Sequence, residues 1–162
     1  MELEERVAEL ERRMAALESG DRDVPRLGGG DFWALEGLKS QLVGAEAGGV
    51  LFTGAVRLPT QEQYEWQYGT LTEELLDADW SEAADSFAAL GHAVRLRLLR
   101  EILGGRRTAA ELAELEGLGT TGQIYHHLRQ LTAAGWLHTA GRGRYEVPGG
   151  RVVPLLVVLS AA

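Results

Sequence analysis

The sequence contains no cysteine, which excludes disulfide scaffolds, thiolate metal sites, iron–sulfur centres and cysteine nucleophiles. Long apolar runs are also missing. The longest, residues 152–159, contains a proline and is far shorter than the roughly 18–20 residues that span a membrane. The sequence opens with acidic residues, Met1 to Glu5, where a secretory signal would be basic and then apolar. We therefore expect a cytoplasmic protein with no membrane partner.

Motifs for catalysis and metal binding are absent as well. The glycines at 28–30 are not a phosphate loop, because no strand precedes them and no Gly-Lys-Ser/Thr follows. No nucleophile with an adjacent base stands out, and the histidines fall on distinct predicted elements, which disfavours a zinc site. We therefore expect no enzymatic activity, no cofactor and no metal.

Charge is distributed unevenly along the 162 residues, whose formal net charge is −8. Residues 1–80 carry 17 acidic and 7 basic side chains, whereas residues 81–162 carry 7 acidic and 9 basic ones. Only the second half has a charge balance that suits contact with a polyphosphate. Two segments of different character are therefore joined in one chain.

Heptad spacing marks residues 1–19. Leucines recur at every seventh position, and Val7 and Met14 occupy the alternate core position between them. This pattern predicts a short coiled-coil dimerisation helix with core positions Leu3, Val7, Leu10, Met14 and Leu17. A single amphipathic helix docked on its own protein is the alternative. A helix this short is marginal alone, so the coiled coil should need a second dimer contact.

Residues 32–80 are predicted to form a small helix and β-hairpin segment, after a flexible linker at residues 20–31. Leucine spacing predicts a helix over 32–42, and alternating apolar residues on both sides of a turn at 59–62 predict a hairpin. The segment either receives a signal, from a small organic ligand or a protein partner, or supports a dimer. Its large aromatic side chains supply a small core or line a ligand pocket, with Trp33, Tyr64, Trp66, Tyr68 and Trp80 as the candidates.

Residues 81–162 show three helical patterns followed by a hairpin pattern. One apolar helix is predicted from Phe87 to Ile102, and a second begins at the capping box that Thr108 opens. A third spans residues 120–134, and residues 136–147 form a hairpin with arginines near its tip. This order is typical of a winged helix-turn-helix domain.

Four segments of this half resemble the ArsR-type winged-helix transcriptional regulators, particularly their actinobacterial members. The similarity lies within residues 83–147, in Leu90-Gly-His-Ala-Val-Arg-Leu-Arg-Leu-Leu99, Glu111-Leu-Ala113, Ile124-Tyr-His-His-Leu128 and Ala134-Gly-Trp-Leu137. The resemblance implies a homodimer in which the recognition helix at 120–134 enters the major groove of double-stranded DNA. It also implies that the wing at 136–147 contacts the adjacent backbone or minor groove.

The metal sensors of such relatives are missing. Some relatives use cysteines on the second helix, where this chain has Glu111 to Glu116, and others use His and Asp on the last helix, where residues 151–160 offer no ligand. Relatives dimerise through their terminal helices, so we expect a C-terminal dimerisation element at Leu155, Leu156 and Leu159. Pro154 suits the first turn of a helix, but a strand over 152–161 stays open at this point.

The third helix predicts a polar face from its spacing alone. If Ile124 marks the buried direction, His126 and Arg129 lie on the opposite side, where side chains reach base edges and phosphates. Gln123 has an alternative role in a capping box, and His127 lies nearer the core and is interpreted as structural. The predicted DNA contacts are Thr120, Thr121, Gln123, Tyr125, His126, Arg129, Arg142 and Arg144.

These observations predict a mainly α, α+β protein with a winged helix-turn-helix domain at 81–162, preceded by a coiled-coil helix and a helix–hairpin segment. The predicted function is a sequence-specific, homodimeric DNA-binding transcriptional regulator, with repression favoured, that associates with the nucleoid when bound. The alternative is a protein-interaction module that keeps the winged helix as a dimer scaffold, since the second half carries only a small excess of positive charge. Arg95 and Arg97 are interpreted as ordinary solvated arginines.

Overall fold

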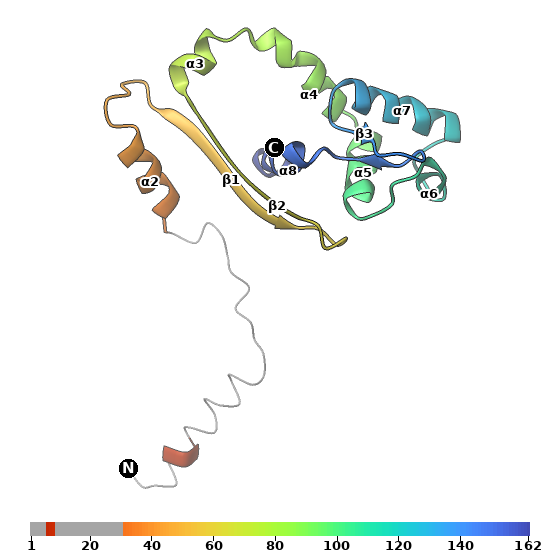
Figure 1. Cartoon of the computed structure of the whole chain (residues 1–162), viewed down its shortest axis with the longest axis horizontal. Coiled ribbons are helices and arrows are strands. Elements are labelled where there is room, and N and C mark those ends of the chain that lie inside the picture. The colour runs from red at the N-terminus through yellow and green to blue at the C-terminus, as the bar shows by residue number, and fades with distance from the viewer. Residues whose placement is uncertain (1–5, 9–30) are drawn as a thin grey trace. The chain divides into compact units, whose positions relative to one another are not determined.

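The computed structural model describes residues 6–8 and 31–162, and its contacts divide the chain into two units, residues 1–38 and 39–162 (Figure 1). Residues 6–8 are helical, and Val7 is 46% exposed. The other predicted coiled-coil positions, Leu3, Leu10, Met14 and Leu17, lie outside the described residues, as does nearly all of the predicted linker. Helix α2, Trp33–Gln41, forms where the leucine spacing predicts it.

A long β-hairpin occupies the predicted position. Strand β1, Gly49–Arg57, pairs antiparallel with β2, Gln63–Leu71, around a turn in which the Leu58 amide donates to the Glu62 carbonyl oxygen at 2.9 Å. Directly paired residues lie on the same face of a sheet. The pairs Phe52↔Tyr68, Gly54↔Trp66 and Val56↔Tyr64 therefore share the apolar, aromatic-rich face that the alternation predicts.

Helix α8, Gly149–Ala161, packs on the hairpin, so residues 152–161 are helix rather than strand (Figure 1). The prediction for Pro154 is wrong in detail, because the helix begins at Gly149 and the proline lies inside it, beyond the first turn. The closest approach is at Gly54, where an added Cβ would lie 2.6 Å from Cγ1 of Val153. The absence of a side chain at Gly54 thus allows α8 to lie against β1.

Six short helical segments and a small wing make up the rest of the described chain. Helix α3 follows the hairpin directly, and a 3₁₀ turn, η1, leads into the four helices of the last domain. Strands β3 and β4 pair antiparallel as the wing, with an isolated bridge from Thr108 to Arg144. The bounds are Thr72–Asp77 (α3), Trp80–Ala83 (η1), Ala84–Leu90 (α4), Ala93–Leu103 (α5), Ala109–Ala113 (α6), Thr121–Ala133 (α7), His138–Thr139 (β3) and Tyr145–Glu146 (β4).

The single helix predicted from Phe87 to Ile102 is two helices, which corrects that prediction. The break falls at Gly91 and His92, and His92 has an extended backbone with φ of −141°. The imidazole of His92 caps the first turn of α5, where its Nδ1 accepts from the Val94 amide at 3.2 Å. A histidine is an uncommon N-cap, so the sequence carries no strong signal for a new helix at this point. The apolar spacing continues across the break and predicts one helix where the structure has two.

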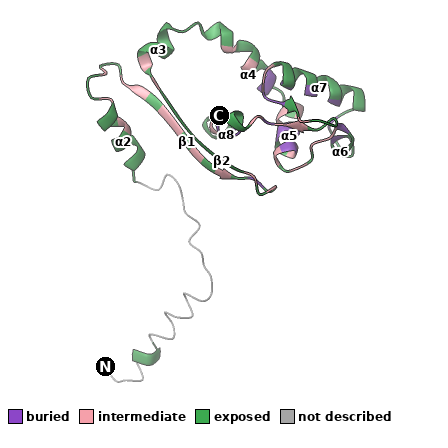
Figure 2. Cartoon of the chain, viewed as in Figure 1, coloured by how far each residue is buried: buried purple, intermediate pink, exposed green. Residues whose placement is uncertain are grey.

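One hydrophobic core joins the helices, the wing and the hairpin end. Leu98, Leu112, Leu128 and Leu155 are fully buried in it, and Leu58 reaches the same core from the hairpin. Figure 2 shows the buried segments on α4 to α7 and the exposed outer face of α7. The fold is therefore α+β, with helices α4 to α7 followed by a two-stranded wing, and it confirms the predicted winged helix-turn-helix class.

Candidate nucleic-acid interface

The first turn of α7 is fixed by a reciprocal capping box. Thr120 Oγ1 accepts from the Gln123 amide at 3.3 Å, and Gln123 Oε1 accepts from the Thr120 amide at 2.8 Å. Gly119 precedes the cap with φ of +92°, and a Cβ there would lie 2.4 Å from Gln123 Oε1. The carbonyl end of Gln123 is therefore committed to the cap, and only its amide nitrogen faces outward as a donor.

The outer face of α7 is polar and exposed along its length (Figure 2). Ile124, Leu128 and Leu131 on the inner face are completely buried, and this fixes the rotation of the helix. Thr121, Tyr125, His126 and Arg129 are consequently exposed, as the 100° spacing predicts. The Arg129 guanidinium makes no hydrogen bond or ion pair with any residue that the structure describes, so its donors remain available.

The wing presents two arginines at and beside its tip. Arg142 lies in the turn with φ of +50°, and the Arg144 amide closes this turn by donating to the Gly141 carbonyl oxygen at 3.1 Å. Both side chains are exposed. Among the residues described, neither guanidinium forms an ion pair. Arg142 therefore gives the wing tip a positive charge, whereas Arg144 lies near the Glu111 carboxylate.

His127 packs against His92 at the inner edge of α7. His127 is partly buried, its ring centroid is 4.7 Å from that of His92, and its Nδ1 is buried without a partner in the described structure. Burial lowers the pKa of His127 below its usual value, and the nearby positive charge of His92, Arg95 and His126 lowers it further. A neutral His127 packed against α5 agrees with the structural role predicted for it.

Arg95 is a structural arginine, which corrects its interpretation as a solvated side chain. Its guanidinium donates to the carbonyl oxygens of Ala88 at 2.8 Å and Ala89 at 2.5 Å, at the end of α4. It also donates to Gln130 Oε1 on α7 at 2.6 Å. Arg97 likewise donates to the Glu116 carbonyl oxygen at 2.5 Å. The Arg95 bonds fix α4 and α7 relative to α5, and the Arg97 bond ties α5 to the segment that follows α6.

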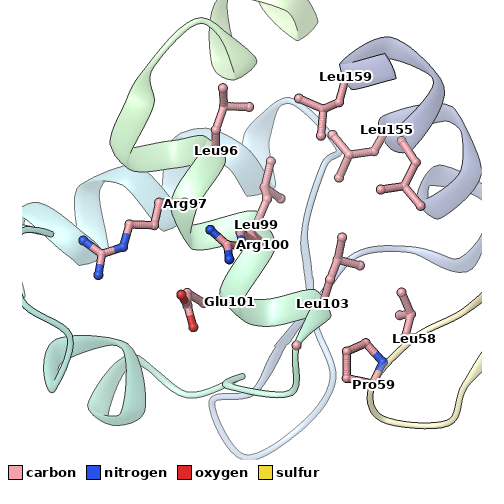
Figure 3. Close-up of a pocket in the computed structure, with 12 residues that line it drawn as sticks. Leu58, Pro59, Leu96, Arg97, Leu99, Arg100, Glu101, Leu103, Leu155 and Leu159 are labelled. Carbon is pink, nitrogen blue, oxygen red and sulfur yellow. The ribbon is translucent and has the colours of Figure 1, made fainter. Parts of the chain in front are cut away.

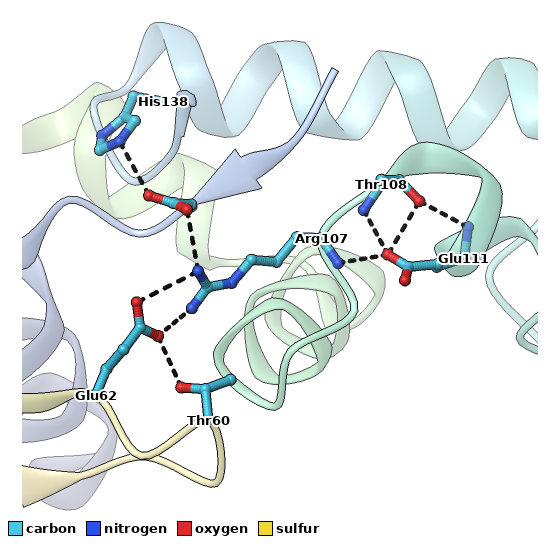
Figure 4. Close-up of polar contacts among 7 residues, drawn as sticks. Thr60, Glu62, Arg107, Thr108, Glu111 and His138 are labelled. Carbon is cyan, nitrogen blue, oxygen red and sulfur yellow. Dashed lines mark hydrogen bonds and ion pairs between the residues drawn. The ribbon is translucent and has the colours of Figure 1, made fainter. Parts of the chain in front are cut away.

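No local pattern in the sequence predicts the cluster around Arg107 (Figure 4). Its guanidinium forms hydrogen bonds and an ion pair with Glu62 in the hairpin turn, and it donates to Glu146 Oε1 of β4 at 3.0 Å. Hydrogen bonds from Arg107 and Thr60 lower the pKa of Glu62. Arg107 follows Arg106 directly, and no local pattern distinguishes the partly buried arginine of the pair from the exposed one.

The five aromatic residues proposed for a ligand pocket occupy several elements. Tyr64, Trp66 and Tyr68 share one face of β2, beside α8. Trp80 is exposed in η1, and its indole nitrogen donates to the Leu75 carbonyl oxygen at 2.6 Å. Trp33 is exposed on α2. None of the five lines the cavity of about 690 Å³ that lies between α5 and α8.

The three leucines proposed for C-terminal dimerisation differ in exposure. Leu155 is completely buried in the core of its own chain, Leu156 is partly buried and Leu159 is 44% exposed. Only Leu156 and Leu159 therefore present apolar surface. Within the described ranges, no group of three or more His, Cys, Asp or Glu side chains has a geometry that suits a metal ion, and no helix is long and apolar enough to cross a membrane.

Comparison with known families finds a match to one part of the chain. Residues 90–139 match the family model described as a helix-turn-helix domain, a span that runs from the end of α4 through α7 to β3. The fold of this segment is that of a helix-turn-helix domain. The second helix of its motif is α7. No curated protein matches the chain.

Proposed function

We propose that the protein is a sequence-specific DNA-binding transcriptional regulator. The observation that carries this proposal is the exposed polar face of α7, with an unpaired Arg129, inside a segment that matches a helix-turn-helix domain. Arg and His side chains on such a face donate to base edges in the major groove. A domain with this match is not typically catalytic, which agrees with the expected absence of enzymatic activity.

Each predicted contact has its own part in the proposed complex. His126 and Arg129 read base edges, with Tyr125 beside them, while Thr120 and Thr121 meet phosphate at the N-terminus of α7. Gln123 has only its amide nitrogen to offer, because its oxygen belongs to the cap. Arg142 and Arg144 on the wing contact the adjacent backbone or minor groove.

We further propose that the regulator acts as a homodimer and represses transcription by occupying its site. The heptad positions of residues 1–19 are the proposed contacts between copies. Leu156 and Leu159 line a groove between α5 and α8 and are the alternative contact, which a small molecule bound in that groove would replace. Two recognition helices related by two-fold symmetry require an inverted repeat whose half-sites lie about 10 base pairs apart or a multiple of that. The specificity would thus come from two α7 helices acting together.

Selection on genomic DNA tests the proposal. Fragmented DNA from the source organism is incubated with the purified protein, and the retained fragments are sequenced at two salt concentrations. We expect a recurring inverted repeat whose recovery falls as salt rises, because phosphate contacts release counterions. Retention of nothing, or of bulk DNA with no motif, would contradict the proposal.

A protein-interaction module is the second candidate. The observation in its favour is an exposed apolar patch on the hairpin, where Val50, Trp66 and Tyr68 are all at least 44% exposed on one face. Patches of this kind often mark interaction sites. The protein-interaction hypothesis predicts that the DNA selection yields no motif and that DNA binding shows no steep dependence on salt.

A further inference from the structure

A cavity of about 690 Å³ lies between α5 and α8, away from the outer face of α7. In Figure 3, Leu96, Leu99 and Leu103 of α5 face Leu155 and Leu159 of α8. Leu58 and Pro59, at the end of β1, close one side. The lining is mostly apolar, with charged side chains at the rim, and the volume falls in the range of roughly 300–1,000 Å³ that is usual for small-molecule sites.

The charged side chains at the rim differ in whether they are already paired. Arg97 extends away from the leucines and donates to the Glu116 carbonyl oxygen at 2.5 Å. Glu101 lies 3.9 Å from Arg106. The Arg100 guanidinium, in contrast, makes no hydrogen bond or ion pair with any residue in the described ranges. One uncommitted cation therefore stands at the edge of an apolar cavity.

We propose that this cavity binds a small molecule with an apolar body and a single carboxylate. The leucines accept the apolar body, since removing its surface from water is favourable, and the Arg100 guanidinium pairs with the carboxylate in bidentate geometry. A neutral ligand would leave Arg100 unused, and a polyanion would meet Glu101 on the same rim. The site differs from the aromatic residues that the sequence suggested for a ligand.

The cavity is connected to the wing through the hairpin turn. Leu58 and Pro59 contact the cavity, and Thr60 and Glu62 follow within the same turn. Glu62 binds Arg107, which in turn binds Glu146 of β4 (Figure 4). A ligand that shifts the turn therefore changes the partners of Arg107 and, through it, the wing. This second step rests on the proposed function in DNA binding.

Binding is tested first on the full chain without DNA. Decanoate and decanol share one apolar chain and differ in charge, so isothermal titration of both isolates the contribution of the carboxylate. We expect saturable binding of decanoate, about three- to fivefold tighter than decanol, which is the upper part of the range for an exposed ion pair. In Arg100→Gln this preference should disappear. The matched control is Arg57→Gln, an exposed arginine at the end of β1 that does not line the cavity, and it should keep the preference.

A cavity-filling variant locates the site. Leu96→Trp adds volume from the partly buried rim of α5, so decanoate affinity should fall at least tenfold while the urea unfolding midpoint stays near that of the wild type. Three outcomes would overturn the proposal: no saturable decanoate binding up to about 1 mM, equal affinity in Leu96→Trp, or an affinity that weakens as protein concentration rises. The last result would mean that a second copy of the chain fills the groove.

The link to the wing is tested on the DNA site recovered by selection. We expect saturating decanoate to weaken wild-type DNA binding by about fivefold or more, the usual scale of coupling between sites. In Glu62→Gln the effect of decanoate should shrink to less than twofold. An undiminished effect in Glu62→Gln would refute this route. The titrations without DNA keep a failure of the ligand site distinct from a failure of the proposed function.

Discussion

Arg107 and Glu146 form an ion pair of 3.0 Å that joins the segment before α6 to the second strand of the wing. The same guanidinium binds Glu62, 45 residues earlier in the chain, and the Arg107 side chain is only 11% exposed. Two carboxylates from separate elements thus share one partly buried cation. Removing that cation would leave two like charges close together and unpaired.

Arg107→Met should therefore destabilise the fold. We expect the free energy of unfolding to fall by about 2 kcal/mol, less than for a fully buried pair because both carboxylates keep some solvent contact. Urea denaturation measures the change. Arg106→Met is the matched control, since the Arg106 side chain is 52% exposed, and it should change stability by less than about 0.5 kcal/mol. Equal effects of the two substitutions would show that the cluster contributes no stability.

Gly54→Ala tests the packing of the hairpin on α8. The new Cβ would lie 2.6 Å from Cγ1 of Val153, a buried β-branched side chain whose rotamer is restricted in a helix. We expect a loss of about 1–3 kcal/mol in urea denaturation. In Gly69→Ala, on the same hairpin, the nearest atom would be at 3.5 Å, so this control should be nearly neutral. A neutral Gly54→Ala would argue against the close contact.

Arg95→Lys separates charge from geometry at the α4–α5–α7 junction. A lysine keeps the charge but cannot reproduce the planar donors that reach Ala88, Ala89 and Gln130. We expect a loss of about 1–2 kcal/mol in the free energy of unfolding. Arg100→Lys, which removes no hydrogen bond among the residues described, is the control and should be silent. An Arg95→Lys protein as stable as the wild type would contradict the structural role.

His127 predicts a dependence of stability on pH. Burial, followed by the charge of His92, lowers the pKa of His127 in the folded state below its value in the unfolded chain. The unfolded state therefore binds the proton more readily than the folded state does. The contribution of His127 to stability is present above its unfolded pKa and is lost as pH falls through its folded pKa. The urea midpoint should decrease between about pH 7 and about pH 5. This decrease should be smaller in His127→Gln. An equal change of the urea midpoint with pH in both proteins would count against the role of His127.

Local signals in the sequence predicted most of the helix-turn-helix segment. The capping box at Thr120, the buried direction of Ile124 and the end of α7 before Gly135 each depend on residues within four positions of one another, and all three are present. The hairpin register also follows from alternation around a short turn. Such features are set by neighbours in the chain, so a single sequence carries them.

The features that escaped prediction depend on residues far apart in the chain. The Arg107 cluster joins positions 45 and 39 residues away, and the seat of α8 on the hairpin depends on a glycine opposite Val153. The apolar run that contains Leu155 has no polar face, and this pattern predicts dimer surface. The Leu155 side chain is instead buried in the core of its own chain. The break at His92 was missed because the apolar spacing continues across it.

Salt-dependent binding to the selected DNA site is the decisive test of a DNA-reading role for α7. Fluorescence anisotropy from about 50 to about 200 mM salt is measured for the wild type, for the variant His126→Ala with Arg129→Ala, and for Arg57→Ala as an exposed control. We expect a steep loss of wild-type affinity with salt, an affinity at least tenfold weaker in the double variant at every salt concentration, and an unchanged control. Wild-type affinity in a folded double variant, or binding that does not respond to salt, would contradict a DNA-reading role for α7.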